Sequence, residues 1–395
     1  MLRSEGAVRI YFDHNATTPV AAPVVDAVSR ALADEFGNAS SVHHFGQRAK
    51  AVLDGARERV AALIHAEPAD VVFTGGGTEA DNFAVRGVAE ALEPRGRKHL
   101  VTSAIEHEAV LNTCRHLERR GWRVTFVPPG PDGVLDPDAF QAAITAETAL
   151  VSVMHANNEI GTIQPVARIA ELAHAAGVVC HTDAVQTVGK VPVDVRALGA
   201  DLLSLSAHKF GGPKGAGALW IRRGTRLVPL MTGGRHERNR RAGTENVPGI
   251  AGLGVAASLA AGGLDASARE IGTLRERLER GILAGVPGTS VNGRPDLRVP
   301  NTSNISFDRV EAESLLIALD LEGIAVSTGS ACSSGTLEPS HVLKAMRLPP
   351  ARTQGAIRFS LGTGNTAVQV DHLIAVLPGI VEKLRSLVGV GVRPR

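Results

Sequence analysis

The sequence predicts an α/β protein with a large domain built on a mainly parallel sheet covered by helices, followed by a smaller α+β domain. The chain has 395 residues, which is too many for one ordinary hydrophobic core. Between about residues 50 and 225, short β-branched runs alternate with stretches of helical periodicity, the pattern of a parallel sheet. Later, charged helical segments alternate with short strands. We therefore predict an N-terminal arm at 1–15, a large domain at 16–260 and a small C-terminal domain at 261–395.

The strands expected in the large domain are short apolar runs bounded by turn-forming segments. They lie at residues 71–74, 100–103, 123–127, 150–155, 178–182, 202–206 and 218–221. Amphipathic stretches such as 166–176 separate most of them and are expected to form helices. In the small domain, the expected helices lie at 268–284, 312–321 and 367–387, and the expected strands at 304–307 and 356–360.

The composition predicts a globular protein of a reducing compartment. Hydrophobic residues make up 44% of the chain and charged residues 21%, and the net charge of +2 gives no reason to expect nucleic-acid binding. Three cysteines do not make a disulfide framework, and residues 1–13 lack the apolar core of a secretory signal. The uncharged stretch 246–264 is as long as a membrane span, but its glycines and alanines favour a buried, tightly packed helix. We expect a cytoplasmic protein with no membrane or nucleic-acid partner.

Ligands of open α/β sheets gather at the carboxyl ends of the strands, so the residues that follow each expected strand are the site candidates. The first strand ends in Thr74-Gly-Gly-Gly-Thr-Glu79, a glycine turn that leads into a helix. Such a turn exposes backbone N–H groups to a phosphate, and Thr78 adds a hydroxyl donor. The turn matches neither the P-loop nor the GxGxxG fingerprint, so a plain tight turn is an equally good interpretation of this feature alone.

Two charged residues follow later strands. Asp183 comes after the fifth strand, in His181-Thr-Asp-Ala-Val-Gln186. A carboxylate there is expensive to bury unless it meets a cation, and the alternative role is a helix N-cap. Lys209 follows the sixth strand, in Ser206-Ala-His-Lys209, before a Gly/Pro turn. A lysine held near a sheet can have a lowered pKa and form a Schiff base, although most lysines are surface residues.

Together, the three features predict a site for pyridoxal 5'-phosphate. This cofactor needs a phosphate anchor, an acid that keeps its pyridine nitrogen protonated, and a lysine for the covalent link. The glycine turn, Asp183 and Lys209 supply one each. A nucleotide-binding module is a weaker interpretation, because its fingerprint is absent.

Longer motifs make the chain resemble the cysteine desulfurases of the nitrogen-fixation and iron–sulfur-cluster type, in the class-V aminotransferase family. The matching runs are Tyr11-Phe-Asp-His-Asn-Ala-Thr-Thr18, Phe73-Thr-Gly-Gly-Gly-Thr-Glu79, Met154-His-Ala-Asn-Asn-Glu-Ile-Gly161, His181-Thr-Asp-Ala-Val-Gln186, Ser206-Ala-His-Lys209, His236-Glu-Arg-Asn-Arg-Arg-Ala-Gly-Thr-Glu-Asn246 and Ser327-Thr-Gly-Ser-Ala-Cys-Ser-Ser-Gly-Thr-Leu-Glu-Pro339. The resemblance covers nearly the whole chain in the expected order. It implies the aspartate-aminotransferase-like fold (fold type I) in a homodimer.

The resemblance also implies a role for individual residues. Lys209 would bind the cofactor covalently, and Asp183 would pair with its pyridinium nitrogen. The remaining implied cofactor contacts are Gln186 to the phenolic oxygen, His107 stacked on the ring, Asn158, and a phosphate site of Gly77, Thr78, Ser206, His208 and Thr244 of the other subunit. Asn158 and Arg358 would bind the substrate carboxylate, for which an arginine is well suited. The alternatives are an ordinary histidine at His107 and a helix cap at Arg358.

The three cysteines differ in their surroundings. Cys114 lies in a helical pattern and Cys180 in an apolar strand, so both are expected to be core residues. Cys332 lies among serine, threonine and glycine, as expected for a thiol that visits a cofactor and then presents sulfur to a partner. No CxxC or HxxxH pairing is present, so no metal site is expected.

The implied reaction converts L-cysteine to L-alanine. Lys209 would move the Cα proton, His107 would move a proton of the substrate thiol, and Cys332 would take the sulfur as a persulfide for an acceptor protein such as an iron–sulfur scaffold. Gly75 replaces a serine common in the family, and the chain ends without the longer tail by which housekeeping members dock their scaffold, so a nitrogen-fixation-like or specialised role stays open.

Three other functions compete with this interpretation. A selenocysteine lyase would use the same residues, and another class-V aminotransferase would have no use for Cys332. A catalytically silent assembly scaffold predicts loss of Lys209 or Cys332, and both are present.

Overall fold

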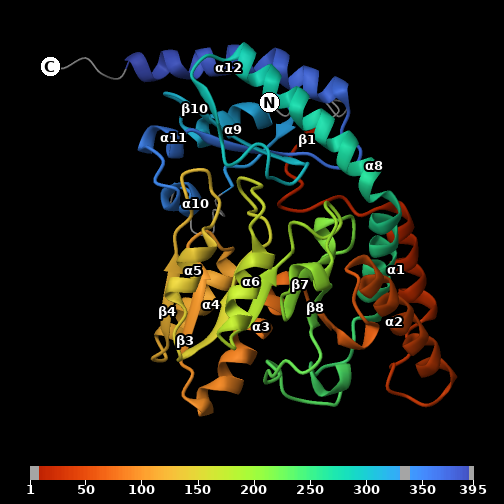
Figure 1. Cartoon of the computed structure of the whole chain (residues 1–395). Helices are drawn as coiled ribbons and strands as arrows, with labels where there is room; N and C mark the ends of the chain where they lie inside the picture. Colours follow the sequence, from red (N-terminus) through yellow and green to blue (C-terminus); the bar gives the residue numbers. More distant parts are fainter. Residues whose placement is uncertain (1–8, 330–338, 391–395) are drawn as a thin grey trace.

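The computed structural model describes residues 9–329 and 339–390, and it contains a large helix-covered sheet and a smaller sheet joined by one long helix (Figure 1). The large sheet has seven strands in the order β2-β8-β7-β6-β5-β3-β4. Their bounds are β2 Val71–Thr74, β3 His99–Ser103, β4 Arg123–Val127, β5 Thr148–Ser152, β6 Val179–Asp183, β7 Leu202–Ser206 and β8 Gly217–Ile221. Each expected strand of the large domain is present, with its ends shifted by a few residues at most, and the predicted fold class is confirmed.

The direction of the strands brings the predicted site residues to one edge of the sheet. Strands β3 to β7 pair in parallel, whereas β8 runs antiparallel between β7 and β2. Thr74 at the end of β2 and Ser206 at the end of β7 therefore both pair with Gly217. A Cβ atom at Gly217 would lie 2.7 Å from the Cα of Gly76, so the glycine lets the turn after β2 approach β8 closely.

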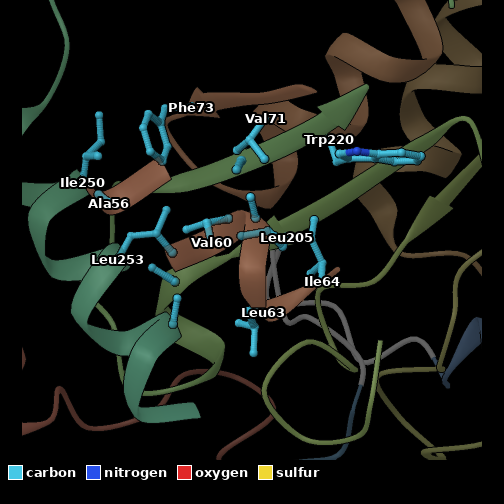
Figure 2. Close-up of a cluster of buried hydrophobic side chains, with 14 of the residues drawn as sticks. Ala56, Val60, Leu63, Ile64, Val71, Phe73, Leu205, Trp220, Ile250 and Leu253 are labelled. Carbon is cyan, nitrogen blue, oxygen red and sulfur yellow. The ribbon is translucent and has the colours of Figure 1, made fainter. Parts of the chain in front are cut away.

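Helices surround the large sheet, and most of them contact its strands directly. They are α1 Ala22–Asp34, α2 His44–Leu63, α3 Gly77–Leu92, α4 Glu108–Glu118, α5 Pro137–Ala143, α6 Val166–Ala175 and α7 Val195–Leu198. Figure 2 shows the core that joins α2 and the start of α8 (Val247–Gly285) to β2, β7 and β8. Val60 and Leu253 from the helices meet Phe73 and Leu205 from the sheet there, all of them buried.

Helix α8 connects the two parts of the chain (Figure 1). We expected two helices, at 246–264 and 268–284, but the structure has one continuous helix across the predicted domain boundary. Its first half packs on α1 and α2, and it also packs on α12 (Ala367–Val390). One window of α8 is long and apolar enough to cross a membrane, but half of that window is buried inside the protein. The helix is therefore a core helix, as predicted for 246–264.

The small domain contains a three-stranded antiparallel sheet of order β12-β10-β9 (β9 Thr289–Asn292, β10 Thr302–Phe307, β12 Ala356–Ser360). Helices α9 Ala312–Leu321, α11 Pro350–Gln354 and α12 accompany it, whereas α10 His341–Ala345 packs through Val342 and Leu343 into a core of the large sheet. The expected irregular arm differs from the structure, because β1 (Ile10–Tyr11) pairs in parallel with β11 (Ile324–Ala325) and Phe12 is buried in the small-domain core. Two residues are too few to show a strand periodicity. The domain division itself stays a prediction.

Candidate active site

A cavity of about 250 Å³ lies at the carboxyl edge of the large sheet. It is lined by Gly77, Thr78 and Asp81 after β2, His107 after β3, Met154 and Asn158 after β5, Asp183, Val185 and Gln186 at the end of β6, and Ser206, His208 and Lys209 at the end of β7. All the predicted site residues except Arg358, Thr244 and Cys332 therefore line one cavity. Five strands contribute to it.

The glycine turn after β2 forms one end of this cavity. Helix α3 begins at Gly77, and its N-cap Gly76 has a φ of 149° and no side chain to cap the helix. A Cβ atom at Gly77 would lie 2.7 Å from Cγ2 of Val185, so a larger residue would intrude on the site. The uncapped helix start, with Thr78 beside it, suits the phosphate of a ligand.

Asp183 is the last residue of β6 and is buried. Its Oδ1 accepts a hydrogen bond from the backbone N of Val185 at 2.9 Å. Burial raises the pKa of this carboxyl group, while the charges of His107 and Lys209 act in the opposite direction. A buried carboxylate of this kind is stabilised by a cation, and a protonated ring nitrogen supplies one. Residues 185–190, which follow Asp183, form turns rather than a helix, so the alternative role as a helix N-cap is wrong.

Lys209 follows β7 in a short 3₁₀ turn, Ala207–Lys209. Its Nζ donates hydrogen bonds to the backbone oxygens of Asn15 at 2.6 Å and Ala16 at 2.8 Å. Burial and the charge of Arg358 lower the pKa of Lys209 from 10.5 to about 8, against the opposing effect of nearby carboxylates. About a tenth of the amine is then uncharged at pH 7, which makes Lys209 a suitable nucleophile and base.

Two histidines at the cavity are held neutral. The Nδ1 atom of His107 accepts a hydrogen bond from the backbone N of Ala109 at 3.1 Å, so His107 caps α4 and carries its proton on Nε2. Burial is the main cause that lowers the pKa of His107. His208 contacts Oγ1 of Thr17 through Nδ1 at 3.1 Å, and burial together with nearby lysines lowers its pKa to about 4.

Arg358 lies in β12 rather than at a helix, so the alternative role as a helix cap is wrong. Its Nη2 lies 2.7 Å from Oδ1 of Asp13, and its Nη1 donates to the backbone oxygen of Asn158 at 3.0 Å. Nε of Arg358 and Oδ1 of Asn158 are buried without a partner in the described part of the chain. Arg358 does not line the cavity itself, but it is fixed against Asn158, which does.

The other predicted residues are placed differently. Thr244 is exposed and does not line the cavity of its own chain, and Cys332 lies outside the described residues. Cys114 and Cys180 are buried, as predicted for core residues. Burial raises the pKa of Cys114 to about 12 and that of Cys180 still further, so neither forms a thiolate readily.

Sequence reasoning missed four residues around this site. They are Asp13, Asn15, Asp81 and Lys190. Asp13 and Asn15 belong to the motif from Tyr11 to Thr18, which we used only as a family signature. Lys190 stands four residues after Gln186, a spacing that would have drawn attention to it. In the ranges 9–329 and 339–390, no cluster of three His, Cys, Asp or Glu side chains is able to hold a metal ion.

Comparison with known proteins defines the class of this site. The family model "Aminotransferase class-V" matches residues 10–373. The chain therefore belongs to the aminotransferase class-V family, whose members of this type are pyridoxal-phosphate enzymes, and the predicted cofactor and enzyme class are confirmed. The residues present fit that cofactor: an uncapped helix start for the phosphate, a buried carboxylate for the ring nitrogen and a lysine of lowered pKa.

Particular relatives narrow the class further. The chain is 52% identical over 381 residues to a protein of Cereibacter sphaeroides named "Cysteine desulfurase", which covers 96% of this chain and 97% of the relative. It is 48% identical over 378 residues to "Cysteine desulfurase IscS" of Dictyoglomus turgidum, covering 96% of each. A solved structure titled "NIFS-LIKE PROTEIN" matches with a TM-score of 0.90 and 37% identity over 95% of this chain and 100% of that one. The predicted resemblance to cysteine desulfurases is confirmed.

Proposed function

We propose that this protein is a cysteine desulfurase that converts L-cysteine to L-alanine and transfers the sulfur to Cys332 as a persulfide. The observation that carries this proposal is Lys209, an amine of lowered pKa that shares a cavity with the buried Asp183 and an uncapped helix start. Relatives named cysteine desulfurase match almost the full length of the chain.

The residues of the chain divide the chemistry between them. When bound, pyridoxal phosphate supplies an electron sink for the substrate Cα. Asp183 would supply the negative charge that keeps the ring nitrogen protonated, and Lys209 in its uncharged form would take the Cα proton. Arg358 and Asn158 hold the substrate carboxylate, with a guanidinium whose buried Nε is still unpaired in the described chain.

Sulfur transfer needs a nucleophile and a proton carrier. The Cys332 thiolate forms a sulfur–sulfur bond with the substrate thiol, and the substrate carbon–sulfur bond breaks. The electron pair of the broken bond goes to the substrate carbon, which takes up a proton and becomes the methyl group of alanine. Cys332 is thereby oxidised to a persulfide while that carbon is reduced. His107, neutral with its proton on Nε2, exchanges the proton of the substrate thiol.

Mass spectrometry of the purified holoenzyme after exposure to cysteine tests this function. We expect one added sulfur atom on Cys332 and an equal amount of alanine. Cys332→Ala should abolish the added sulfur, whereas Cys114→Ala and Cys180→Ala should keep it, because those thiols are buried. Alanine formation at the parental rate in Cys332→Ala would contradict a protein persulfide and favour direct expulsion of sulfur.

We also infer a homodimer that shares residues between its sites. Thr244 is exposed in a single chain. The segment that carries it is nonetheless fixed, because Glu237 forms a buried two-point ion pair with Arg57 (2.7 Å for each contact) and Arg241 pairs with Glu79 at 2.9 Å. A fixed segment that presents an exposed threonine suits a contact with the phosphate site of a partner.

A mixing experiment tests the shared site. An inactive Lys209→Ala chain mixed with an impaired Thr244→Val chain should regain activity, because one site of the mixed dimer contains both native residues. Light scattering should show a dimer. A fully active monomer would rule out this arrangement.

The acceptor and the location follow from the same proposal. We infer that the persulfide passes to an acceptor protein such as an iron–sulfur scaffold, which the name of the Dictyoglomus turgidum relative supports. A cytoplasmic location fits the use of a free thiol. Transfer of labelled sulfur from Cys332 to a purified scaffold protein tests the acceptor. No observation favours selenocysteine over cysteine as the substrate.

A further inference from the structure

A second lysine, Lys190, lies beside Lys209 and has no role in the chemistry described so far. Its side chain lies in the wall of a separate cavity of about 400 Å³ that Lys209 also lines. Its Nζ donates hydrogen bonds to Oε1 of Gln186 at 2.6 Å and to Oδ1 of Asn15 at 3.1 Å. In the described part of the chain, no carboxylate pairs with this amine. Two lysines placed side by side without an acid repel each other and destabilise the fold, and groups placed at such a cost often serve the function of a site.

The charged surroundings of Lys190 are almost all basic. Lys209 and Arg358 face it, and it acts in turn on the neighbouring His14 and His208. Burial, followed by the charges of Lys209 and Arg358, lowers the pKa of Lys190 well below its usual value. The two hydrogen bonds persist in either protonation state, because an uncharged amine still has two N–H donors.

The contact with Gln186 determines which end of its amide faces the cofactor cavity. Oε1 of Gln186 accepts the hydrogen bond from Lys190, and this assignment agrees with the other end of the amide, which meets the backbone oxygen of Asn15, a group that only accepts. The NH₂ end therefore points the other way, where one N–H donates to the backbone oxygen of Asn15 at 3.0 Å. Gln186 lines the cavity, so its second N–H is available to an acceptor there.

The contact with Asn15 extends the effect of Lys190 to other site residues. Oδ1 of Asn15 accepts hydrogen bonds from Lys190 and from Asn301 at 2.9 Å, which leaves its Nδ2 to donate to the backbone oxygen of Asn158 at 3.1 Å. The backbone oxygen of Asn15 accepts the hydrogen bond from Lys209. Lys190 thus fixes the residue that holds the catalytic amine.

We propose that Lys190 is a positioning residue that presents Gln186 as a hydrogen-bond donor to the phenolic oxygen of the cofactor. The proposal rests on the pyridoxal-phosphate site described above. A donor held next to that oxygen stabilises its anionic form, so the bound cofactor loses its proton at a lower pH. Without Lys190, the amide of Gln186 keeps only its hydrogen bond to the backbone oxygen of Asn15, so its NH₂ group is held less firmly as a donor to the phenolic oxygen.

The experiment follows the visible absorbance of the bound cofactor as a function of pH. Lys190→Met keeps the apolar stem and removes the amine. In this variant the pH at the midpoint of the absorbance change should rise by about one unit. Cofactor affinity, measured by equilibrium dialysis, should fall about three- to tenfold. Lys190→Gln keeps a donor and should give a smaller rise. The control Lys50→Met, at an exposed side chain of α2, should leave both values unchanged.

A double-variant cycle separates positioning from simple stabilisation of the fold. If Lys190 acts through Gln186, Gln186→Leu should raise the midpoint alone, and Lys190→Met should add little further rise in the double variant. An unchanged midpoint in Lys190→Met would overturn the proposal; if that variant does not fold, the same holds for Lys190→Gln. The proposal also fails if the rise in the double variant equals the sum of the rises in the two single variants. The parent's alanine production from cysteine is measured in parallel, so failure of the proposed function is seen separately.

Discussion

The lowered pKa of Lys209 predicts that this amine reacts at an unusually low pH in the protein without its cofactor. A fall from 10.5 to about 8 raises the uncharged fraction at pH 7 from about 0.03% to about 10%, a factor of about 300. The structure also predicts how neighbours change this value. Arg358 lowers the pKa of Lys209 and Asp183 raises it, so Arg358→Met should move the midpoint of reactivity up and Asp183→Asn should move it down.

Competitive labelling with trace acetic anhydride measures this midpoint. The apoprotein is labelled over a series of pH values and digested, and the acetylation of Lys209 is measured by mass spectrometry against the exposed Lys50 as an internal reference. We expect half-maximal reactivity near pH 8. A midpoint close to 10.5, or a downward shift in Arg358→Met, would refute the electrostatic reasoning.

Two further predictions concern the packing around the site. Glu237→Gln should lower the free energy of unfolding in urea by about 3–5 kcal/mol, because Arg57 would stay buried without its partner charge; Glu67→Gln, in an exposed ion pair, should cost less than about 1 kcal/mol, and equal losses would contradict the argument. Gly77→Ala should weaken cofactor binding at least about tenfold, because its Cβ meets Val185, whereas Gly55→Ala, with open space around it, should not; unchanged binding in Gly77→Ala would remove the steric argument.

Local signals made the large sheet predictable. Each strand carries its own apolar run, and in a parallel sheet the residues that follow the strands lie at the same edge. The positions of Asp183 and Lys209 at that edge were therefore predictable from short motifs. The continuity of α8 was not predictable in this way. Gly262 and Gly263 interrupt its apolar pattern and suggest a helix end, yet a side chain at Gly262 would meet only open space and the helix continues. Packing against α1, α2 and α12 outweighs the weak local preference.

Long-range pairs were beyond sequence reasoning for a different reason. Arg358 was assigned to a substrate carboxylate, but it meets the carboxylate of Asp13, 345 residues away in the chain. No local pattern contains information about such a pair. A substrate carboxylate must either share Arg358 with Asp13 or displace Asp13 from it. The unpaired Nε of Arg358 allows the two carboxylates to share the guanidinium.

The contacts of Asn15 explain why the segment from Tyr11 to Thr18 belongs to the active site. Asn15 bonds to Lys190 and Lys209 at the large sheet. Through its side chain it also bonds to Asn301 and to Thr302, the first residue of β10 in the three-stranded sheet. Asn15 therefore links the carboxyl edge of the large sheet to the three-stranded sheet. A shift of the three-stranded sheet that breaks these bonds releases two hydrogen-bond acceptors from the site lysines at once.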